Sequence, residues 1–136
     1  MVINFFSKHD LLDMIAQSDL YVHASDMEIE AMSCMEAFAG GLVPVIADSP
    51  KSATPQFALD EHSLFVAGNS SDLAEKIDFW YEHPFEKDIM GAKYVEQGKR
   101  YDLDTCVLAA EEMFREAIRE SRGAVQHEEE MSEQWA

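Results

Sequence analysis

The sequence contains few cysteines and no long apolar run. Its two cysteines, Cys34 and Cys106, lie far apart and outside any CxxC pair, which argues against a structural disulfide or a zinc site. The five histidines show no metal-ligand spacing. No stretch approaches the ~20 apolar residues that cross a bilayer, and residues 1–6 lack the basic start of a signal peptide. We therefore expect a cytoplasmic protein that binds no metal and inserts no segment into a membrane.

Basic residues are also scarce. The chain has 10 Lys and Arg against 27 Asp and Glu, a formal net charge of −17. Such a surface repels nucleic acid phosphates and anionic lipid headgroups, so neither is expected as a direct partner. Part of the acidic excess lies in residues 124–136, which we predict to be a flexible tail after a structured domain over residues 1–123.

The apolar content is sufficient for one hydrophobic core, at 47% of 136 residues. Residues 20–24 and 42–47 are nearly continuous hydrophobic runs, as in strands of a parallel sheet that is covered on both faces. Residues 2–6 and 63–67 predict two further short strands.

Helical patterns separate these strands. Ser7 and Asp10 fit a capping box, so a helix should follow and end near residue 18. Its predicted buried face consists of Leu11, Leu12 and Ile15. A second helix is predicted over residues 33–39, and Gly40 with Gly41 should end it.

Three more helices follow the last strand. Residues 69–72 offer N-caps for the first, whose apolar stripe is predicted to be core. This stripe consists of Leu73, Ile77, Trp80 and Tyr81. Pro84 separates it from a helix over residues 85–97. The last helix begins near Asp102 or Asp104 and carries a stripe that we predict to be buried. That stripe consists of Leu103, Val107, Ala110, Phe114 and Ala117.

The alternation of strands and helices indicates an α/β fold with a parallel sheet. Three or four strands would make about half of the six-stranded sheet of a dinucleotide-binding domain. The sequence shows no internal repeat and no linker rich in Gly and Ser. We therefore expect one short α/β layer structure with C-terminal helices.

Two glutamates carry the most informative chemistry. Glu28 should lie in the loop that leaves a strand, and Glu36 in the first turns of the next helix. Ligands of open parallel sheets bind outside the carboxyl ends of the strands, and the amides of a helix N-terminus favour anions. Carboxylates accept hydrogen bonds from sugar hydroxyls. The arrangement therefore matches a sugar nucleotide, which has hydroxyls at both ends and a diphosphate between them.

These residues resemble a known signature. The chain has S-x-x-E, then Glu36 eight residues after Glu28, followed by Ala37, Gly41 and P-V-I-A. This pattern resembles that of family-four retaining glycosyltransferases, and the resemblance covers residues 2–118. It implies a partial Rossmann-like domain, the C-terminal domain of the GT-B architecture, as a three-layer sandwich. It also implies metal-independent transfer of a hexose from a UDP-hexose donor to a lipid or glycan acceptor, with no cofactor.

The stretches I-E-x-x-S-C-M-E-A-F-A-x-G and S-P-K-S-A-T-P-Q-F-A-L-D narrow the resemblance. They are similar to glucosyltransferases of bacterial glycolipid and cell-envelope synthesis. This similarity implies membrane association of the full-length enzyme.

The resemblance also implies roles for individual residues. Glu36 would hold the ribose hydroxyls, and Glu28, at the catalytic position, would contact the transferred sugar. The amides implied for the diphosphate are those of Met32, Ser33 and Cys34. The family often has Gly-Phe-Gly after the first glutamate, whereas this chain has Ile29-Glu30-Ala31. Glu30 is either a ligand contact or a solvated loop acid.

Four further residues could line the edge of the crevice: His23, Lys51, Ser52 and Thr54. A packed or exposed histidine is the better explanation of His23, and an ordinary surface loop explains the other three residues at least equally well. The paired glutamates could also serve only as helix caps and dipole partners.

The resemblance further implies what the chain lacks. An N-terminal acceptor-binding domain is missing, as is a basic pair that would face the donor diphosphate, because Lys8 is the only Lys or Arg in residues 1–19. We therefore expect the isolated chain to be inactive and its last helix to form a homo-oligomer. The alternatives are a non-catalytic α/β interaction module or scaffold, and a phosphatase or response-regulator-like domain. The last alternative is weak, because the sequence shows no phosphorylatable acidic cluster at a first strand.

Overall fold

The computed structural model describes residues 5–134 of the chain, with side chains through residue 121. It divides into two units, Met1–Lys99 and Arg100–Ala136. The first unit is an α/β structure around a parallel sheet, and the second is a long helix. The predicted fold class is confirmed for the first unit.

Three parallel strands form the sheet, in the order β1-β2-β3. They are β1 (Tyr21–His23), β2 (Pro44–Asp48) and β3 (Leu64–Val66), and each lies within a predicted strand or extends one residue beyond it. Val22 pairs with Val45, and Ala47 pairs with Phe65. The first four residues of β2 are buried, as expected for the central strand of a parallel sheet.

The edges of the sheet depart from the prediction. Val22 and Val66 are exposed, so β1 is not covered on both faces as its apolar run suggested. An edge strand can have an apolar sequence although other elements cover only one of its faces. The strand predicted over residues 2–6 is not found at Phe5 and Phe6, which are exposed and outside any strand. Its first three residues lie outside the described part of the chain.

The first helix, α1 (Lys8–Ala16), begins as predicted. The Ser7 hydroxyl accepts a hydrogen bond from the Asp10 N–H at 3.2 Å and donates one to the Asp10 carboxylate at 2.7 Å. Its predicted buried face is wrong, because Leu11 and Leu12 are exposed. The helical spacing of apolar residues predicts an apolar face, but it does not show whether another element packs on that face. Ile15, which is half-buried, lies beside the end of the next helix.

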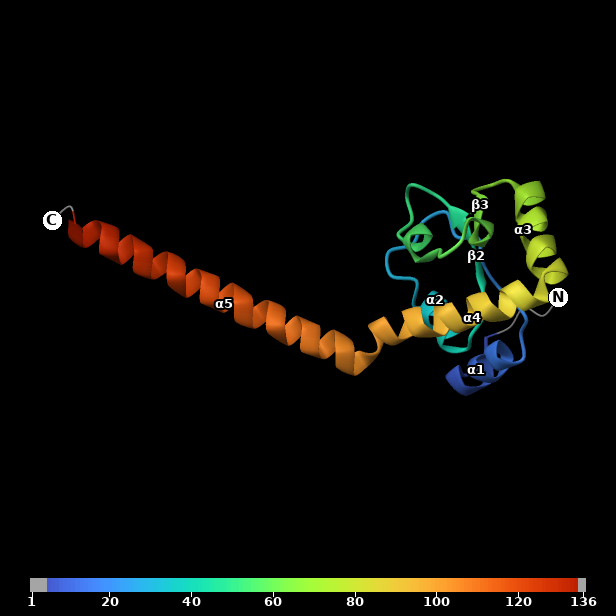
Figure 1. Cartoon of the computed structure of the whole chain (residues 1–136), viewed down its shortest axis with the longest axis horizontal. Coiled ribbons are helices and arrows are strands. Elements are labelled where there is room, and N and C mark those ends of the chain that lie inside the picture. Colours follow the sequence, from blue (N-terminus) through green and yellow to red (C-terminus); the bar gives the residue numbers. More distant parts are fainter. Residues whose placement is uncertain (1–4, 135–136) are drawn as a thin grey trace. The chain divides into compact units, whose positions relative to one another are not determined.

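Helices α2 (Met32–Ala39) and α4 (Pro84–Gly98) pack closely against each other (Figure 1). Gly41, with a φ of 77°, ends α2 as predicted. A Cβ on Gly91 of α4 would lie 2.5 Å from the Gly41 carbonyl oxygen, so only a glycine fits at this crossing.

Helix α3 (Ser70–Glu82) packs against β3. Asn69 caps it by accepting hydrogen bonds from the Ser71 and Asp72 N–H groups, which confirms the predicted start. Trp80 is buried and donates from Nε1 to the His62 carbonyl at 3.0 Å. Tyr81, predicted as core, is 84% exposed, because successive helical residues point about 100° apart.

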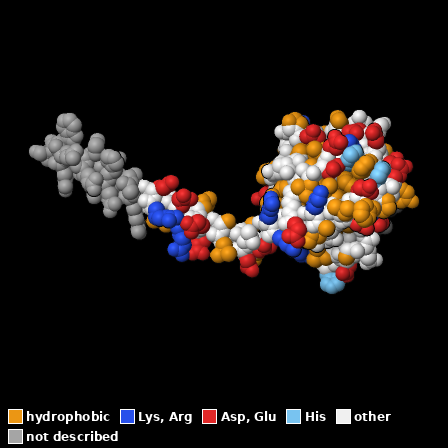
Figure 2. Space-filling model, viewed as in Figure 1, with side chains coloured by type: hydrophobic (Ala, Val, Ile, Leu, Met, Phe, Trp, Pro, Cys, Tyr) orange, Lys and Arg blue, Asp and Glu red, His pale blue; other side chains and the backbone are white. Residues whose placement is uncertain are grey.

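The core of the first unit lies between the sheet and its helices. Phe38 of α2 stacks on Tyr94 of α4 at a ring-centroid distance of 4.9 Å, and both side chains are fully buried. The Tyr94 hydroxyl accepts a hydrogen bond from the Leu59 N–H at 2.9 Å. This packing holds the chain that follows β2 against α4. On the outside, Asp and Glu side chains are scattered over the visible face among hydrophobic and other side chains (Figure 2).

The second unit consists mainly of α5 (Leu103–Gln134). Asp102 caps its start by accepting from the Thr105 N–H and hydroxyl at 3.0 and 2.6 Å. The stripe predicted to be buried is exposed except at the half-buried Ala110, with Phe114 at 62%. The spacing of apolar residues identifies the apolar face of a helix but not whether another element covers it. The helix continues past residue 123, whereas the side chains of the predicted tail lie outside those described. Among the described residues, no helix is long and apolar enough to span a bilayer.

Candidate functional site

The site predicted from the two glutamates lies at the carboxyl ends of β1 and β2. The loops that follow these strands, residues 24–31 and 49–53, run side by side (Figure 1). Glu28 and Ser52 form a parallel bridge, and the Ala53 N–H donates to the Glu28 carbonyl at 2.9 Å. This is the end of a parallel sheet at which α/β proteins bind ligands.

Backbone amides hold the Glu28 carboxylate. Its Oε1 accepts from the Ile29 N–H at 3.0 Å. Hydrogen bonds from the backbone N–H groups of Ile29 and Ala31 lower the pKa of Glu28, so the group is charged at neutral pH. Its side chain is only half-buried and stays accessible.

Ala31 gives this loop its shape. Its φ of 50° and ψ of 52° are left-handed, a conformation that costs a residue with a Cβ about 1–2 kcal/mol. The residue is buried, so packing holds it in place. It stands where the glycosyltransferases that the sequence resembles often have a glycine, and this loop adopts the glycine-type turn with alanine.

The start of α2 has no side-chain cap. The Cys34 N–H donates to the Ala31 carbonyl at 2.8 Å. Contrary to the prediction, it is therefore not free to bind a phosphate. The amides of Met32 and Ser33 occupy the first turn, where N–H groups have no partner within the helix. An anion is favoured at such a position.

Glu36 lies on α2, one turn further on. Its side chain is 25% exposed, and the Lys8 Nζ lies 3.9 Å from its Oε1. Neither Glu36 nor Glu28 is buried in apolar packing. Such burial would prevent either carboxylate from contacting a sugar nucleotide.

His23 packs beneath the site. It is 8% exposed, and its Nδ1 lies 2.9 Å from the Tyr21 hydroxyl, which donates to Ser33 Oγ at 2.8 Å. Burial raises the pKa of Tyr21 to about 12 and that of the Cys34 thiol to about 11. Cys34 therefore stays a thiol and does not act as a nucleophile. Tyr21, His23 and Ser33 connect the end of β1 to the start of α2.

The remaining predicted residues of the crevice edge lie on the loop after β2. Thr54 is fully buried and offers no surface to a ligand in this structure, and its hydroxyl contacts Ser52 Oγ at 2.7 Å. Lys51 is exposed and pairs with Asp26, at 3.1 Å from Nζ to Oδ2. These contacts are made within and between the two loops.

A group 1 glycosyl transferase model matches residues 1–101. The chain belongs to this family of glycosyl transferases. It is similar to the catalytic domain of cholesterol-alpha-glucosyltransferase from Helicobacter pylori, with 47% sequence identity and a TM-score of 0.69. The similarity covers 72% of this chain and 62% of that chain. A search of the curated proteins gave no match.

These findings confirm the family inferred from the glutamate pattern and the GT-B type of fold. For a glycosyl transferase of this group, the non-catalytic scaffold is the less favoured interpretation. The sequence reasoning missed Asp26 and Ser49, which join the two loops. The only sequence signal for Ser49 is its position directly after a buried strand.

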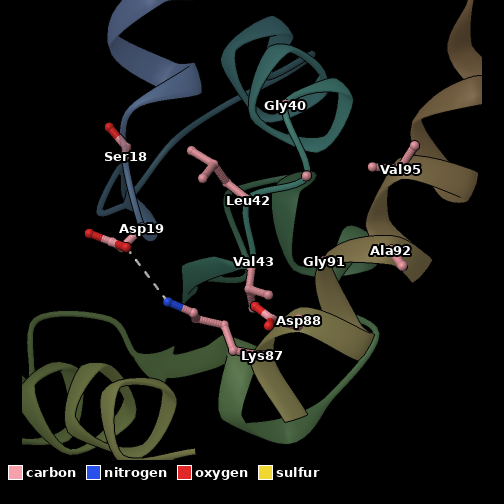
Figure 3. Close-up of a pocket in the computed structure, with 11 residues that line it drawn as sticks. Ser18, Asp19, Gly40, Leu42, Val43, Lys87, Asp88, Gly91, Ala92 and Val95 are labelled. Carbon is pink, nitrogen blue, oxygen red and sulfur yellow. Dashed lines mark ion pairs between the residues drawn. The ribbon is translucent and has the colours of Figure 1, made fainter. Parts of the chain in front are cut away.

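The glycosyl transferase unit also has a cavity at the opposite end of the sheet (Figure 3). It lies between the residues before β1, the turn after α2 and helix α4, and contains neither Glu28 nor Glu36. Lys87 and Asp19 face each other across it, with Nζ and Oδ1 3.9 Å apart. Among the described residues, no group of three or more His, Cys, Asp or Glu could hold a metal ion.

Proposed function

We propose that residues 5–99 bind a UDP-hexose at the carboxyl ends of β1 and β2, as the donor-binding part of a retaining glycosyltransferase. The observation that carries this proposal is the accessible, charged Glu28 beside the uncapped start of α2. Membership of the glycosyl transferase family supports it. The proposed binding needs neither a cofactor nor a metal.

Each part of the donor then has a partner of suitable chemistry. Glu36 accepts from the ribose hydroxyls, and the amides of Met32 and Ser33 face the diphosphate. Glu28 accepts from hydroxyls of the transferred hexose, close to the bond that breaks. Glu30 is exposed on the same loop and is not required for this arrangement.

We further propose a lipid acceptor. Three apolar side chains next to Glu28 are exposed: Met27, Ile29 and Met32. An apolar rim beside a charged residue fits a hydrophobic substrate that carries a hydroxyl group. The name of the Helicobacter pylori enzyme gives cholesterol as the molecule it glucosylates, which supports an acceptor of this kind.

Transfer requires positive charge that the described site does not supply. Two lysines that the structure describes at the site are already paired with carboxylates: Lys8 faces Glu36, and Lys51 pairs with Asp26. A missing electrostatic contact to the leaving diphosphate costs on the order of 3 kcal/mol of transition-state stabilisation. We therefore propose that residues 5–99 bind the donor but transfer no sugar without an acceptor-binding domain. A cytoplasmic location fits, because both cysteines are free thiols.

Titration of the isotope-labelled chain with UDP-glucose and with UDP tests this proposal. Both ligands should shift the NMR resonances of residues 28–36, because both carry the diphosphate and the ribose. Glu36→Gln should lower the affinity for both ligands roughly tenfold, which is the effect of losing one hydrogen bond to a charged group. Glu28→Gln should weaken UDP-glucose by a similar factor and leave UDP unchanged.

Glu75→Gln is the matched control, since it removes the same charge from an exposed position on α3. It should leave both affinities unchanged. Saturable shifts elsewhere in the chain, or equal effects of all three substitutions, would refute the proposed site.

A further inference from the structure

The loop that carries Glu28 is held by polar contacts. Met27 and Ile29, on either side of Glu28, are both exposed and provide no packing. The chain before Glu28 is instead attached at Asp26. The Ser49 hydroxyl lies 2.8 Å from the Asp26 carbonyl oxygen and 2.9 Å from its Oδ1, and it donates to these two acceptors.

Ser49 can hold Asp26 because Ser49 is itself fixed. It directly follows β2 and is 2% exposed. Its oxygen also accepts a hydrogen bond from the Lys51 N–H at 3.3 Å, and the Lys51 ammonium group reaches the other Asp26 oxygen at 3.1 Å. The Ser49 hydrogen bond and the Lys51 charge lower the pKa of Asp26, so its carboxylate stays ionised at neutral pH.

A second tie lies two residues further along the loop. The Ala53 N–H donates to the Glu28 carbonyl at 2.9 Å, and the segments pair at Glu28 and Ser52. The backbone of residues 26–28 is therefore attached at both ends to one loop. This places the Glu28 carboxylate where the amides of Ile29 and Ala31 close around it.

We propose that Ser49, acting through Asp26, is a positioning residue that sets the place of the Glu28 carboxylate and thereby the recognition of the transferred sugar. The effect on the sugar rests on the proposed function. Ser49 does not touch the donor. Its removal should therefore weaken the contact made by Glu28 and leave the contacts of Glu36 with the nucleotide intact.

The ratio of UDP-glucose affinity to UDP affinity measures this effect. In Ser49→Ala the ratio should fall by up to roughly tenfold, the scale of one hydrogen bond to a charged group. Ser63→Ala is the matched control, because Ser63 is an equally buried serine at the amino end of β3. Asp26→Ala changes an exposed residue and should lower the ratio as well.

A double-mutant cycle distinguishes positioning from general damage. If Ser49 acts through Glu28, then Ser49→Ala should not lower the ratio further in a Glu28→Gln background. A ratio in Ser49→Ala that equals that of Ser63→Ala would overturn the proposal. An additive loss in the double variant would overturn it too.

A second measurement needs no ligand. The pKa of Glu28, followed by carboxyl NMR, should rise toward its ordinary value in Ser49→Ala, because the amides no longer close on the carboxylate. If the unsubstituted chain binds neither UDP nor UDP-glucose, the proposed function fails and this measurement alone decides the positioning. A rise supports it, and an unchanged pKa overturns it.

Discussion

At the scale of single residues, the surroundings of each ionisable group separate those that can contact a ligand from those that pack. Backbone amides keep the accessible Glu28 charged, whereas burial keeps Tyr21 and Cys34 protonated. The sequence could place Glu28 and Glu36 because strand and helix patterns lie directly beside them. It could not reveal the contact of Asp26 with Ser49, since that contact depends on how two loops meet in space.

The tie at Asp26 should make stability depend on pH. Its folded pKa is lowered, so its contribution is fully present above the ordinary value near 4 and is lost as the pH falls through the folded value. Asp26→Asn should therefore lower the free energy of unfolding at pH 7. The difference from the unsubstituted chain should be smaller at pH 2 than at pH 7.

Urea denaturation at both pH values measures this difference, and high salt should reduce it because the residue is exposed. Asp10→Asn makes a poor control because Asp10 contacts Ser7, whereas Asp78→Asn changes an exposed acid on α3 and is the matched control. A loss for Asp26→Asn that is as large at pH 2 as at pH 7 would disprove the electrostatic origin.

At the scale of elements, helix ends could be predicted better than helix burial. Ser7 and Asn69 cap their helices by contacts within three residues, which the sequence contains in full. The exposure of Leu12 and Tyr81 depends on which neighbouring element reaches them. Caps are local properties, whereas burial is a property of pairs of elements.

The crossing of α2 and α4 is the element contact most sensitive to a small change. In Gly91→Ala, the new Cβ would lie 2.5 Å from the Gly41 carbonyl oxygen, so backbone would have to move. Overpacking of this kind costs about 1–3 kcal/mol, more than the roughly 1 kcal/mol that alanine contributes in a helix. The free energy of unfolding should fall, as measured by urea denaturation followed by circular dichroism.

Gly40→Ala provides the comparison. Its Cβ would meet the Ile15 Cγ2 at 2.7 Å, a side-chain atom of α1, whose apolar face is largely exposed. Because α1 can shift at little cost, this variant should lose less stability than Gly91→Ala. Equal losses would show that the approach of α4 to the Gly41 carbonyl is not the limiting contact.

At the scale of the whole molecule, the buried hydrophobic core and the candidate donor site both lie in the first unit. The core residues end at Tyr94, and the family match ends at residue 101. The α/β architecture could be inferred from sequence, because apolar runs alternate with helical stripes along the chain. The exposure of the apolar stripe on α5 could not be inferred, since an apolar helix face has the same sequence pattern whether or not a partner covers it.

Two opposing forces act on α5. Its exposed apolar stripe favours contact with a second copy of the chain, as we expect from the sequence, while the net charge of −17 opposes association. Salt weakens the repulsion, because the screening length falls from about 10 Å at 0.1 M to about 3 Å at 1 M, and it leaves the hydrophobic attraction in place. The weight-average mass in sedimentation equilibrium should therefore rise with salt.

Phe114→Glu, which adds charge to the stripe, should stay monomeric at every salt concentration, whereas Glu75→Gln should behave like the unsubstituted chain. A mass that is independent of salt in all three chains would mean that the stripe does not associate with a second copy.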